Sequence, residues 1–464
     1  CCDAIRRGVN PHEPPKSLIC EWLSMPSDLG VSVQRSLLRE LIRWKSRPNR
    51  KPLIVQGARQ TGKTWLMNEF ARQEFPDFVR IDFLYDEAAR SLFSQNLDPH
   101  QIVSRIELRT GHHIDPERTL IIFDEMQEAP RGLTSLKYFC EQAREYHIVA
   151  AGSYMGLSLH QGDSFPVGKV DRLTLRPMSF VEFVRAVSGD LLADALLRAD
   201  VDLLTASDDL LGQRLKEYFV IGGMPEVVDS FRRDGDVTEC RRLQLQVLSD
   251  YDGDFGKHVP TRILERLRLV WRSLPGQLAR ENKKFVYGVV RAGARARNFE
   301  ESLQWLRDYG VVHRVPRVST LRFPLSGYES VSGFKLFCVD VGLLGALAGL
   351  DPSVALGGSS LFSEFKGAMT EQYVAQELFG LGLLPVYWSS STGSAEVDFA
   401  IDHRAGALPI EVKAHENLRA KSLRVACEKF GLTRAVRTSL SPYRDEGWLV
   451  NIPLWALGQI ERLA

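Results

Sequence analysis

A glycine-rich segment that follows a short apolar run is the feature that most limits what this chain can fold into. Residues 57–64 read G-A-R-Q-T-G-K-T, after the apolar run Pro52–Val55 and before the helical pattern Trp65–Phe75. Glycines let the backbone curl so that its N–H groups face phosphate oxygens, and the following helix adds the positive end of its dipole. The pattern G-x-x-x-x-G-K-T between a strand and a helix predicts the phosphate-binding loop of a P-loop domain.

The residue types of this loop predict the cofactors. Lys63 is expected to reach the β- and γ-phosphates of ATP, and the Thr64 hydroxyl is expected to hold Mg²⁺. We expect the whole loop to bind the nucleotide, through Gly57, Ala58, Arg59, Gln60, Thr61, Gly62, Lys63 and Thr64.

Two acids at the end of a second apolar run support a site for hydrolysis. The run Thr119–Phe123 ends in Asp124 and Glu125. Buried acids are costly unless a charged group needs them, so we expect Asp124 to support Mg²⁺ and Glu125 to act as the base that polarises the attacking water. Ser153 follows the run Ile148–Ala151 and is a candidate for contacting the γ-phosphate.

The order of apolar runs predicts an α/β fold. Runs at residues 52–55, 78–83, 119–123 and 148–151, with a weaker fifth at 173–175, alternate with helical stretches. Short apolar runs of this kind indicate a parallel sheet covered on both faces. Residues 180–258 are expected to form helices interrupted by the turn 222–225. Helices and a short β wing are expected over 260–345, and a new pattern begins at about Pro352.

Composition excludes several classes of protein. The chain has 464 residues, which predicts roughly two to four domains. The net charge of +1 gives no indication of nucleic-acid binding for the chain as a whole. The seven cysteines include no C-x-x-C pair, which argues against a disulfide scaffold and favours a reducing cytoplasm. No apolar run is long enough for a membrane span, so no membrane association is expected.

The middle of the chain carries a local excess of positive charge. Residues 262–297 contain ten lysines and arginines against two acids, a local charge of +8. Helices and a wing with concentrated positive charge predict contact with nucleic-acid phosphates. The helix after Asn298 carries Glu300, Glu301 and Asp308. We therefore expect the preceding basic segment and the wing to contact the shape or backbone of the nucleic acid rather than read its bases. The alternative is a solvated charged surface or a protein-docking module.

Two C-terminal runs place acids and a lysine on one face. Ala395–Ile401 and Pro409–Lys413 are predicted to be paired strands, which would bring Asp398, Glu411 and Lys413 together. Two carboxylates can hold Mg²⁺ against a phosphate, and a lysine can orient water. Glu371, on the predicted helix 364–378, would join this group. The alternative is a ladder of surface ion pairs.

Taken together, the motifs resemble those of a large bacterial and archaeal family of AAA+-type ATPases with a C-terminal domain of unknown function. The motifs that carry this resemblance occur in the order Gly57–Thr64, Phe123–Glu125, Ala151–Ser153, Leu175–Phe183 and Gly222–Glu226.

The resemblance implies an order of domains. These are an AAA+-type ATPase core with a parallel sheet (31–185), a helical lid (186–258), a winged helix (259–350) and an α/β nuclease-like domain (351–464). Residues 1–30 show no sustained periodicity and are expected to form an N-terminal tail. The resemblance also implies a homo-oligomeric ring, with a hexamer as the first expectation, in which an arginine of one subunit completes the neighbouring site. Arg172 is the candidate, with Arg176 as a second.

The C-terminal pattern is similar to the PD-(D/E)XK phosphodiesterase fold, which includes restriction enzymes and archaeal Holliday-junction resolvases. Val397 stands where the motif has proline, which leaves cleavage open. The resulting hypothesis is an ATPase that acts on DNA, with branched DNA such as a four-way junction as the candidate substrate. The alternatives are a nucleotide-switched signalling or defence ATPase with a silent C-terminal domain, and a metal-dependent nuclease regulated by ATP.

Overall fold

The computed structural model describes residues 35–152, 166–280, 283–357, 360–390, 395–404, 406–414 and 420–464. The predicted N-terminal tail, residues 1–30, lies outside the described residues.

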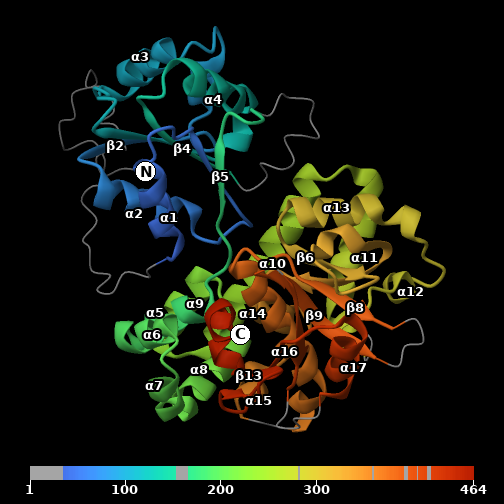
Figure 1. Cartoon of the computed structure of the whole chain (residues 1–464). Coiled ribbons are helices and arrows are strands. Elements are labelled where there is room, and N and C mark those ends of the chain that lie inside the picture. The colour runs from blue at the N-terminus through green and yellow to red at the C-terminus, as the bar shows by residue number, and fades with distance from the viewer. Residues whose placement is uncertain are drawn as a thin grey trace, which may run out of the picture. The chain divides into compact units, whose positions relative to one another are not determined.

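A five-stranded parallel sheet forms the N-terminal part of the described chain (Figure 1). Its order is β2-β3-β4-β1-β5, and each strand pairs with its neighbours in parallel. The four predicted strands and the weaker fifth are confirmed, with ends that shift by one or two residues. The strands are β1 (Leu53–Gln56), β2 (Asp77–Asp82), β3 (Thr119–Asp124), β4 (His147–Gly152) and β5 (Asp171–Thr174).

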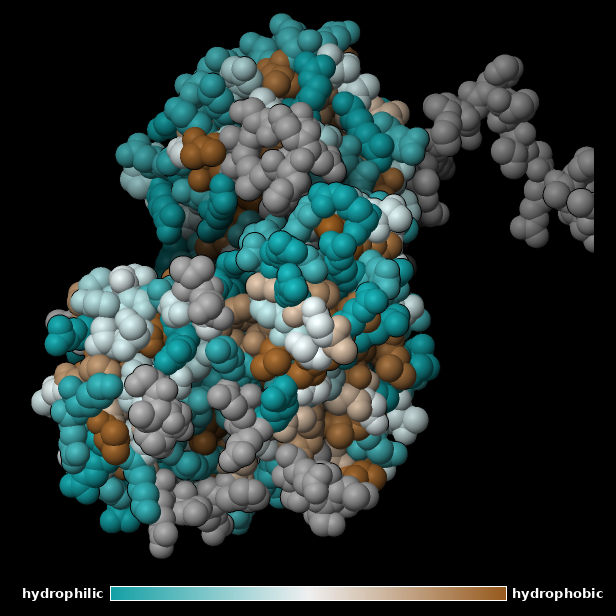
Figure 2. Space-filling view, turned by 90° about the vertical axis from the view of Figure 1, so that its right-hand side faces the viewer, coloured by the Kyte–Doolittle hydropathy of each residue, from teal (hydrophilic) through white to brown (hydrophobic). Residues whose placement is uncertain are grey.

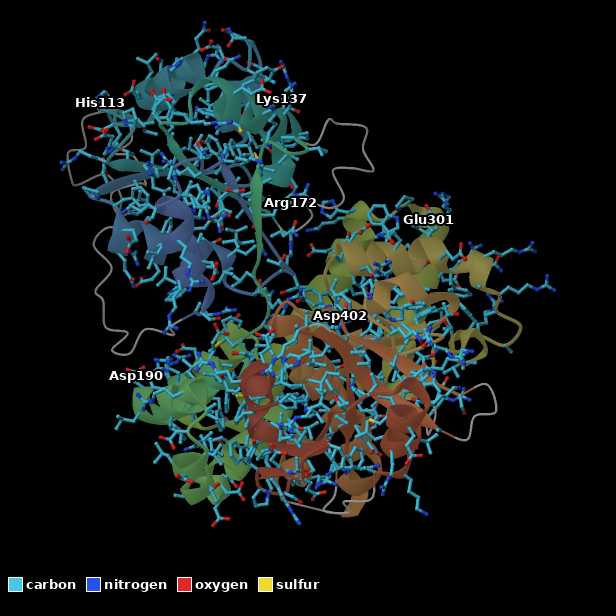
Figure 3. All side chains as sticks on the ribbon, viewed as in Figure 1. His113, Lys137, Arg172, Asp190, Glu301 and Asp402 are labelled. Carbon is cyan, nitrogen blue, oxygen red and sulfur yellow. The ribbon has the colours of Figure 1, made fainter. Side chains whose placement is uncertain are left out.

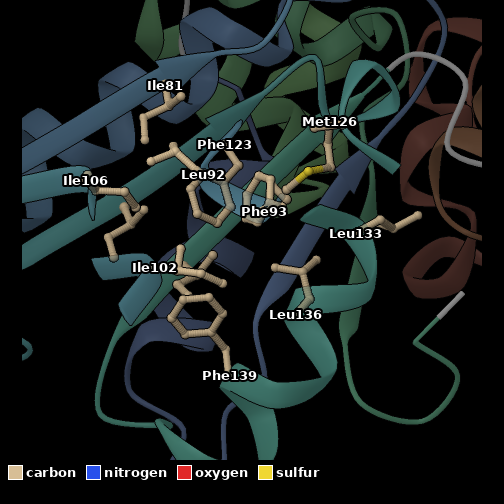
Figure 4. Packing of buried hydrophobic residues seen from close by; sticks show 14 of the residues in the cluster. Ile81, Leu92, Phe93, Ile102, Ile106, Phe123, Met126, Leu133, Leu136 and Phe139 are labelled. Atoms are coloured by element: carbon tan, nitrogen blue, oxygen red, sulfur yellow. The ribbon is translucent and has the colours of Figure 1, made fainter. Parts of the chain in front are cut away.

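Helices cover both faces of this sheet, because alternate residues of each strand are apolar on opposite sides. One face packs against α1 (Leu37–Lys45) and α2 (Lys63–Glu74) through Leu53 and Val55. The other face packs against α3 and α4 through residues that include Ile81 and Phe123 (Figure 4). The elements on that side are η2 (Glu87–Phe93), α3 (Pro99–Thr110), η3 (Met126–Glu128) and α4 (Pro130–Gln142).

A run of helices follows, as predicted for residues 180–258. The turn Gly222–Met224 separates two of them. The helices are α5 (Phe180–Ser188), α6 (Asp190–Arg198), α7 (Val201–Ala206), α8 (Asp208–Ile221), α9 (Pro225–Asp234) and α10 (Val237–His258).

No helix among the described residues is long and apolar enough to cross a membrane. Hydrophilic residues are interspersed with small hydrophobic patches on the face shown in Figure 2.

The middle of the chain combines helices with a β hairpin. The hairpin is antiparallel, and its first strand also pairs in parallel with β8, at Arg317↔Tyr387 and Val318↔Trp388. The predicted wing is therefore the edge of a larger sheet. The elements are α11 (Thr261–Leu278), α12 (Tyr287–Val290), η5 (Ala296–Asn298), α13 (Glu300–Asp308), β6 (Val312–Val318), η6 (Leu325–Tyr328), β7 (Glu329–Cys338), α14 (Val341–Leu347) and α15 (Pro352–Leu356).

The C-terminal segment supplies the rest of that sheet, which has eight strands in the order β12-β13-β11-β10-β9-β8-β6-β7. The two predicted strands correspond to β9 and β10, which pair antiparallel. The elements are α16 (Ser360–Gly380), β8 (Val386–Ser389), β9 (Glu396–His403), β10 (Gly406–Val412), α17 (Lys421–Phe430), β11 (Ala435–Ser439), β12 (Arg444–Asp445), β13 (Leu449–Pro453), η7 (Leu454–Gln459) and α18 (Ile460–Leu463).

The motifs Leu175–Phe183 and Gly222–Glu226 contact each other. The N–H of Met178 donates to the carbonyl of Gly223 at 2.7 Å. The N–H of Gly223 in turn donates to Asp340 Oδ2 at 2.6 Å. A Cβ at position 223 would lie 2.1 Å from the carbonyl oxygen of Met178, so only glycine fits. This junction joins the end of the ATPase sheet to the helical segment and to the start of α14.

Substitution of Gly223 tests this close approach. We expect Gly223→Ala to lower the free energy of unfolding by about 1–3 kcal/mol, because the added methyl group must displace backbone. Gly212→Ala in α8 is the matched control, since a Cβ there meets no atom within 4 Å. Alanine should stabilise that helix slightly. Thermal unfolding measures both, and equal shifts for the two variants would contradict the packing described.

Candidate functional site

The predicted phosphate-binding loop lies between β1 and α2. Gly62 precedes the first residue of α2 and has a left-handed backbone, with φ of 88°. A Cβ at Gly57 would lie 2.1 Å from the carbonyl oxygen of Leu175. These two glycines let the loop curl tightly, so that the N–H groups at the start of α2 form a site for an anion.

Lys63 lies inside the loop in this structure. It is 7% exposed, and its Nζ donates to the carbonyls of Gly57 at 3.1 Å and Ala58 at 2.7 Å. Burial lowers the pKa of Lys63 to about 8, although Glu125 and Asp124 oppose this shift. An anion in the loop would provide the buried ammonium with a charged partner.

Thr64 and Asp124 are brought together as predicted. The Thr64 hydroxyl donates to Asp124 Oδ2 at 2.9 Å, and Asp124 is 2% exposed at the end of β3. A hydroxyl and a carboxylate are oxygen ligands of the kind that Mg²⁺ prefers, so these residues fit the predicted ion.

Arg80 on β2 is a contact of Asp124 that the sequence did not reveal. Its Nε and Nη2 lie 3.1 Å and 2.8 Å from Asp124 Oδ2. Nη2 also lies 2.8 Å from Asp82 Oδ2. The alternation of Arg80 and Asp82 along a predicted strand was the available signal, since residues two apart share a face.

Glu125 follows β3 with a left-handed backbone, φ 52°. Burial raises its pKa, while a hydrogen bond of 2.5 Å from Gln127 Nε2 opposes the shift. A carboxylate with a raised pKa, close to Lys63 and Asp124, is suited to accept a proton from water.

The other predicted residues of the site have different outcomes. Ser153 lies outside the described residues. Arg172 lies on β5 and is exposed (Figure 3). Arg176 follows β5, and its guanidinium lies 5.8 Å from the centre of the Phe379 ring. Burial lowers the pKa of Arg176. The contribution of either arginine to a neighbouring subunit stays a prediction.

Helix α10 contacts the loop, which sequence reasoning did not predict. Arg59 pairs with Asp254 at 2.6 Å, and Gln60 Nε2 donates to Asp250 Oδ2 at 2.7 Å. The Tyr251 hydroxyl donates to the carbonyl of Arg59 at 3.0 Å. Arg59 and Gln60 occupy x positions of the pattern G-x-x-x-x-G-K-T, where any residue type is allowed. Both are held by α10, about 190 residues later in the chain.

The predicted basic segment divides into paired and exposed side chains. Arg262 pairs with Glu301 at 2.5 Å and Arg268 with Asp252 at 2.8 Å, while Lys283 pairs with Glu371. Six exposed arginines take no part in the ion pairs of the described residues. They are Arg266, Arg272, Arg280, Arg291, Arg295 and Arg297.

The C-terminal acids are arranged around a buried lysine. Lys335 of β7 is 1% exposed and lies 2.8 Å from Glu396 and 3.6 Å from Glu371. Burial by itself would lower the pKa of Lys335, but Glu371, Asp398 and Glu396 more than offset this and raise it. Burial, followed by the charge of Glu371, raises the pKa of Asp398 to about 7.

Glu411 of β10 pairs at 2.6 Å with Lys413, the residue that follows this strand. Asp398 accepts the N–H of Val412 at 2.8 Å. In the part of the chain that is described, no three His, Cys, Asp or Glu side chains are arranged to hold a metal ion. Lys413 pairs with Glu411, and Lys283 and Lys335 pair with Glu371. The role of Asp398 and Glu411 as Mg²⁺ ligands, and with it the nuclease centre, stays a prediction.

Removal of Lys335 tests this compensation. We expect Lys335→Met to lower the free energy of unfolding by about 3 kcal/mol, because the buried Glu371 would keep only Lys283 as a partner and the half-buried Glu396 would lose its ion pair. Arg242→Met is the control, since Arg242 forms an exposed pair with Glu239 and its loss should have no measurable effect. Urea unfolding measures both variants, and an unchanged midpoint for the Lys335 variant would contradict the arrangement.

Comparison with known families divides the chain into three segments. Residues 49–184 match an AAA domain. Residues 212–354 match a domain of unknown function, DUF8612, and residues 366–457 match another, DUF4143. The first match and the five-stranded parallel sheet identify the N-terminal part as an AAA-type P-loop ATPase domain.

Solved structures with similar chains include the following three. The Walker-type ATPase PABY2304 of Pyrococcus abyssi is 15% identical with a TM-score of 0.40, over 68% of this chain and 96% of that one. The ORC1 protein of Aeropyrum pernix, solved in complex with DNA, is 14% identical with a TM-score of 0.27, over 68% and 92%.

The third is the signal transduction ATPase with numerous domains (STAND) PH0952 of Pyrococcus horikoshii, which has a tetratricopeptide repeat sensor. It is 11% identical with a TM-score of 0.27, over 75% of this chain and 46% of that one. None of the curated proteins matches this sequence.

Proposed function

We propose that this chain binds and hydrolyses Mg-ATP and uses its basic middle segment to act on DNA. The observation that carries the hydrolysis is one cluster at the ends of β1 and β3. It contains the Lys63 ammonium, the Thr64–Asp124 pair at 2.9 Å and the Glu125 carboxylate.

The residues of the cluster divide the work. The N–H groups of residues 62–64 bind phosphate at the positive end of α2. The Lys63 ammonium exchanges the carbonyls of Gly57 and Ala58 for phosphate oxygens. Its positive charge then stabilises the negative charge on the phosphoryl group that is transferred. Glu125 orients a water molecule and accepts its proton. Mg²⁺, when bound at Thr64 and Asp124, neutralises charge on the phosphates.

Glu125→Gln tests the assignment of the base. Glutamine keeps the shape of the side chain but cannot accept the proton. We expect turnover to fall by roughly 10²- to 10⁴-fold while the affinity for ATP stays within about twofold. Glu128→Gln is the matched control, because that acid pairs with Arg90 at 3.2 Å. Phosphate release and equilibrium binding measure the two effects, and full turnover by the Glu125 variant would exclude it as the base.

The exposed arginines of the middle segment support the DNA part of the proposal. Arg291, Arg295 and Arg297 precede α13, and no ion pair of the described residues neutralises them. The acids Glu300 and Glu301 open α13, so phosphate contacts come from the segment before the helix. A branched DNA such as a four-way junction is the substrate that the resemblance to resolvases suggests, and a hexameric ring is the assembly that the AAA+ resemblance suggests.

Reversal of this charge tests the contact with DNA. We expect the triple variant with Arg291, Arg295 and Arg297 changed to Glu to bind DNA at least tenfold more weakly and with a shallower dependence on salt, because fewer counterions are released. Arg242→Glu controls for a change in net charge. Binding and ATP turnover are measured with single strands, duplex and a four-way junction at one salt concentration. Unchanged binding by the triple variant would contradict the proposed surface.

A second function, a nucleotide-switched signalling ATPase, is favoured by one observation. Asp254 and Tyr251 of α10 hold Arg59 of the loop, which connects the nucleotide site to the helices that follow. ATP turnover that is equal with every form of DNA, together with a protein partner captured in one nucleotide state, would favour this function over the first.

A further inference from the structure

We propose that Arg80 is the resident counter-ion of Asp124, and that it must release this carboxylate before Mg-ATP is bound. Arg80 then sets the Mg²⁺ concentration at which the nucleotide site fills. The inference rests on the proposed ATP site and adds a positioning residue that none of the sequence motifs contains.

The bonding of Asp124 is the first reason. Its Oδ2 accepts from the Thr64 hydroxyl at 2.9 Å and from Arg80 Nε at 3.1 Å, with Arg80 Nη2 at 2.8 Å. Its Oδ1 accepts the N–H of Glu125 at 3.1 Å. A carboxylate that is 2% exposed needs a positive partner, and in this structure Arg80 is that partner. Thr64 and Asp124 cannot support a divalent cation fully while the guanidinium holds the same oxygen.

The freedom of Arg80 is the second reason. The Arg80 side chain is 33% exposed, whereas Asp124 is enclosed. Arg80 also has an alternative partner already in contact, since its Nη2 lies 2.8 Å from Asp82 Oδ2. Asp82 lies directly opposite Asp124 in the register of β2 and β3. A rotation of the side chain toward Asp82 would free Asp124 without a change in the backbone.

Asp82 is anchored for this role. Its Oδ1 accepts the N–H groups of Leu84 at 3.1 Å and Tyr85 at 3.2 Å, which leaves Oδ2 for Arg80. The two acids therefore compete for one guanidinium, and Mg²⁺ competes with that guanidinium for Asp124. Removal of Arg80 and removal of the Asp82 charge should shift the requirement for Mg²⁺ in opposite directions.

The experiment measures binding of a fluorescent, non-hydrolysable ATP analogue as MgCl₂ is titrated at a fixed analogue concentration. We expect Arg80→Ala to lower the Mg²⁺ concentration at half-saturation by roughly three- to tenfold, because a competing cation is lost. Arg80→Lys, which keeps the charge but loses the second donor, should give a smaller shift in the same direction. It also serves as the second variant if Arg80→Ala fails to fold.

Asp82→Asn is the opposing variant. Asparagine can still accept the N–H groups of Leu84 and Tyr85, but it attracts Arg80 less, so we expect the Mg²⁺ concentration at half-saturation to rise. In the Arg80→Ala background the same substitution should have no effect, because Asp82 acts through Arg80. A rise that persists in the double variant would mean that Asp82 acts on the metal directly and would overturn the inference.

The outcomes separate this inference from the proposed function. Absence of Mg²⁺-dependent binding by the wild-type chain would count against the ATP site itself. Normal binding by the wild type with an unchanged or higher Mg²⁺ requirement in Arg80→Ala would leave the ATP site intact and refute the role of Arg80. A variant that loses stability without a shift in its Mg²⁺ requirement would show that Arg80 only supports the fold.

Discussion

At the sites of interest, each buried charged side chain is held by an opposite charge or by hydrogen bonds to the backbone, and these sites depend on that pairing. A buried charge without a partner costs several kcal/mol. In the ATPase domain Asp124 is paired with Arg80. The Lys63 ammonium donates to two carbonyl oxygens, which a bound anion can replace. Arg35 follows the same rule, since it pairs with Glu182 at 3.3 Å and donates to the carbonyl of Thr61 at 2.8 Å. Binding of a nucleotide is then an exchange of partners rather than the filling of an uncharged cavity.

The same rule describes the C-terminal part of the chain, with a different consequence. Lys335 and Lys283 come from the segment that matches one family, and Glu371 and Glu396 come from the segment that matches another. Their ion pairs, together with the pairing of β6 and β8, join the two segments into one sheet. Glu371, one of the acids that suggest a phosphodiesterase in the sequence, thus contributes to cohesion between segments in the structure.

The sequence predicts the ATPase domain well because its signals are local. The loop Gly57–Thr64, the acid pair at the end of β3 and the five strands each depend on residues that are neighbours in the chain, and the structure has them where the pattern indicates. Arg80, Asp254 and Lys335 could not be predicted in this way. Their partners lie 44, 195 and 36 or more residues away, and only the packing of strands and helices brings them together. The short β wing expected in the middle segment is a hairpin in the structure, and its pairing with β8 could not be predicted because it depends on a strand about 70 residues later.

Equilibrium binding and hydrolysis of ATP by the wild-type chain and by Lys63→Ala, in the same Mg²⁺ buffer, test the central claim most directly. The account predicts that the wild type binds ATP and releases phosphate, and that Lys63→Ala does neither, because the loop loses the charge that holds the phosphates. Binding and turnover that persist unchanged in Lys63→Ala, or a wild-type chain that binds no ATP, would contradict it.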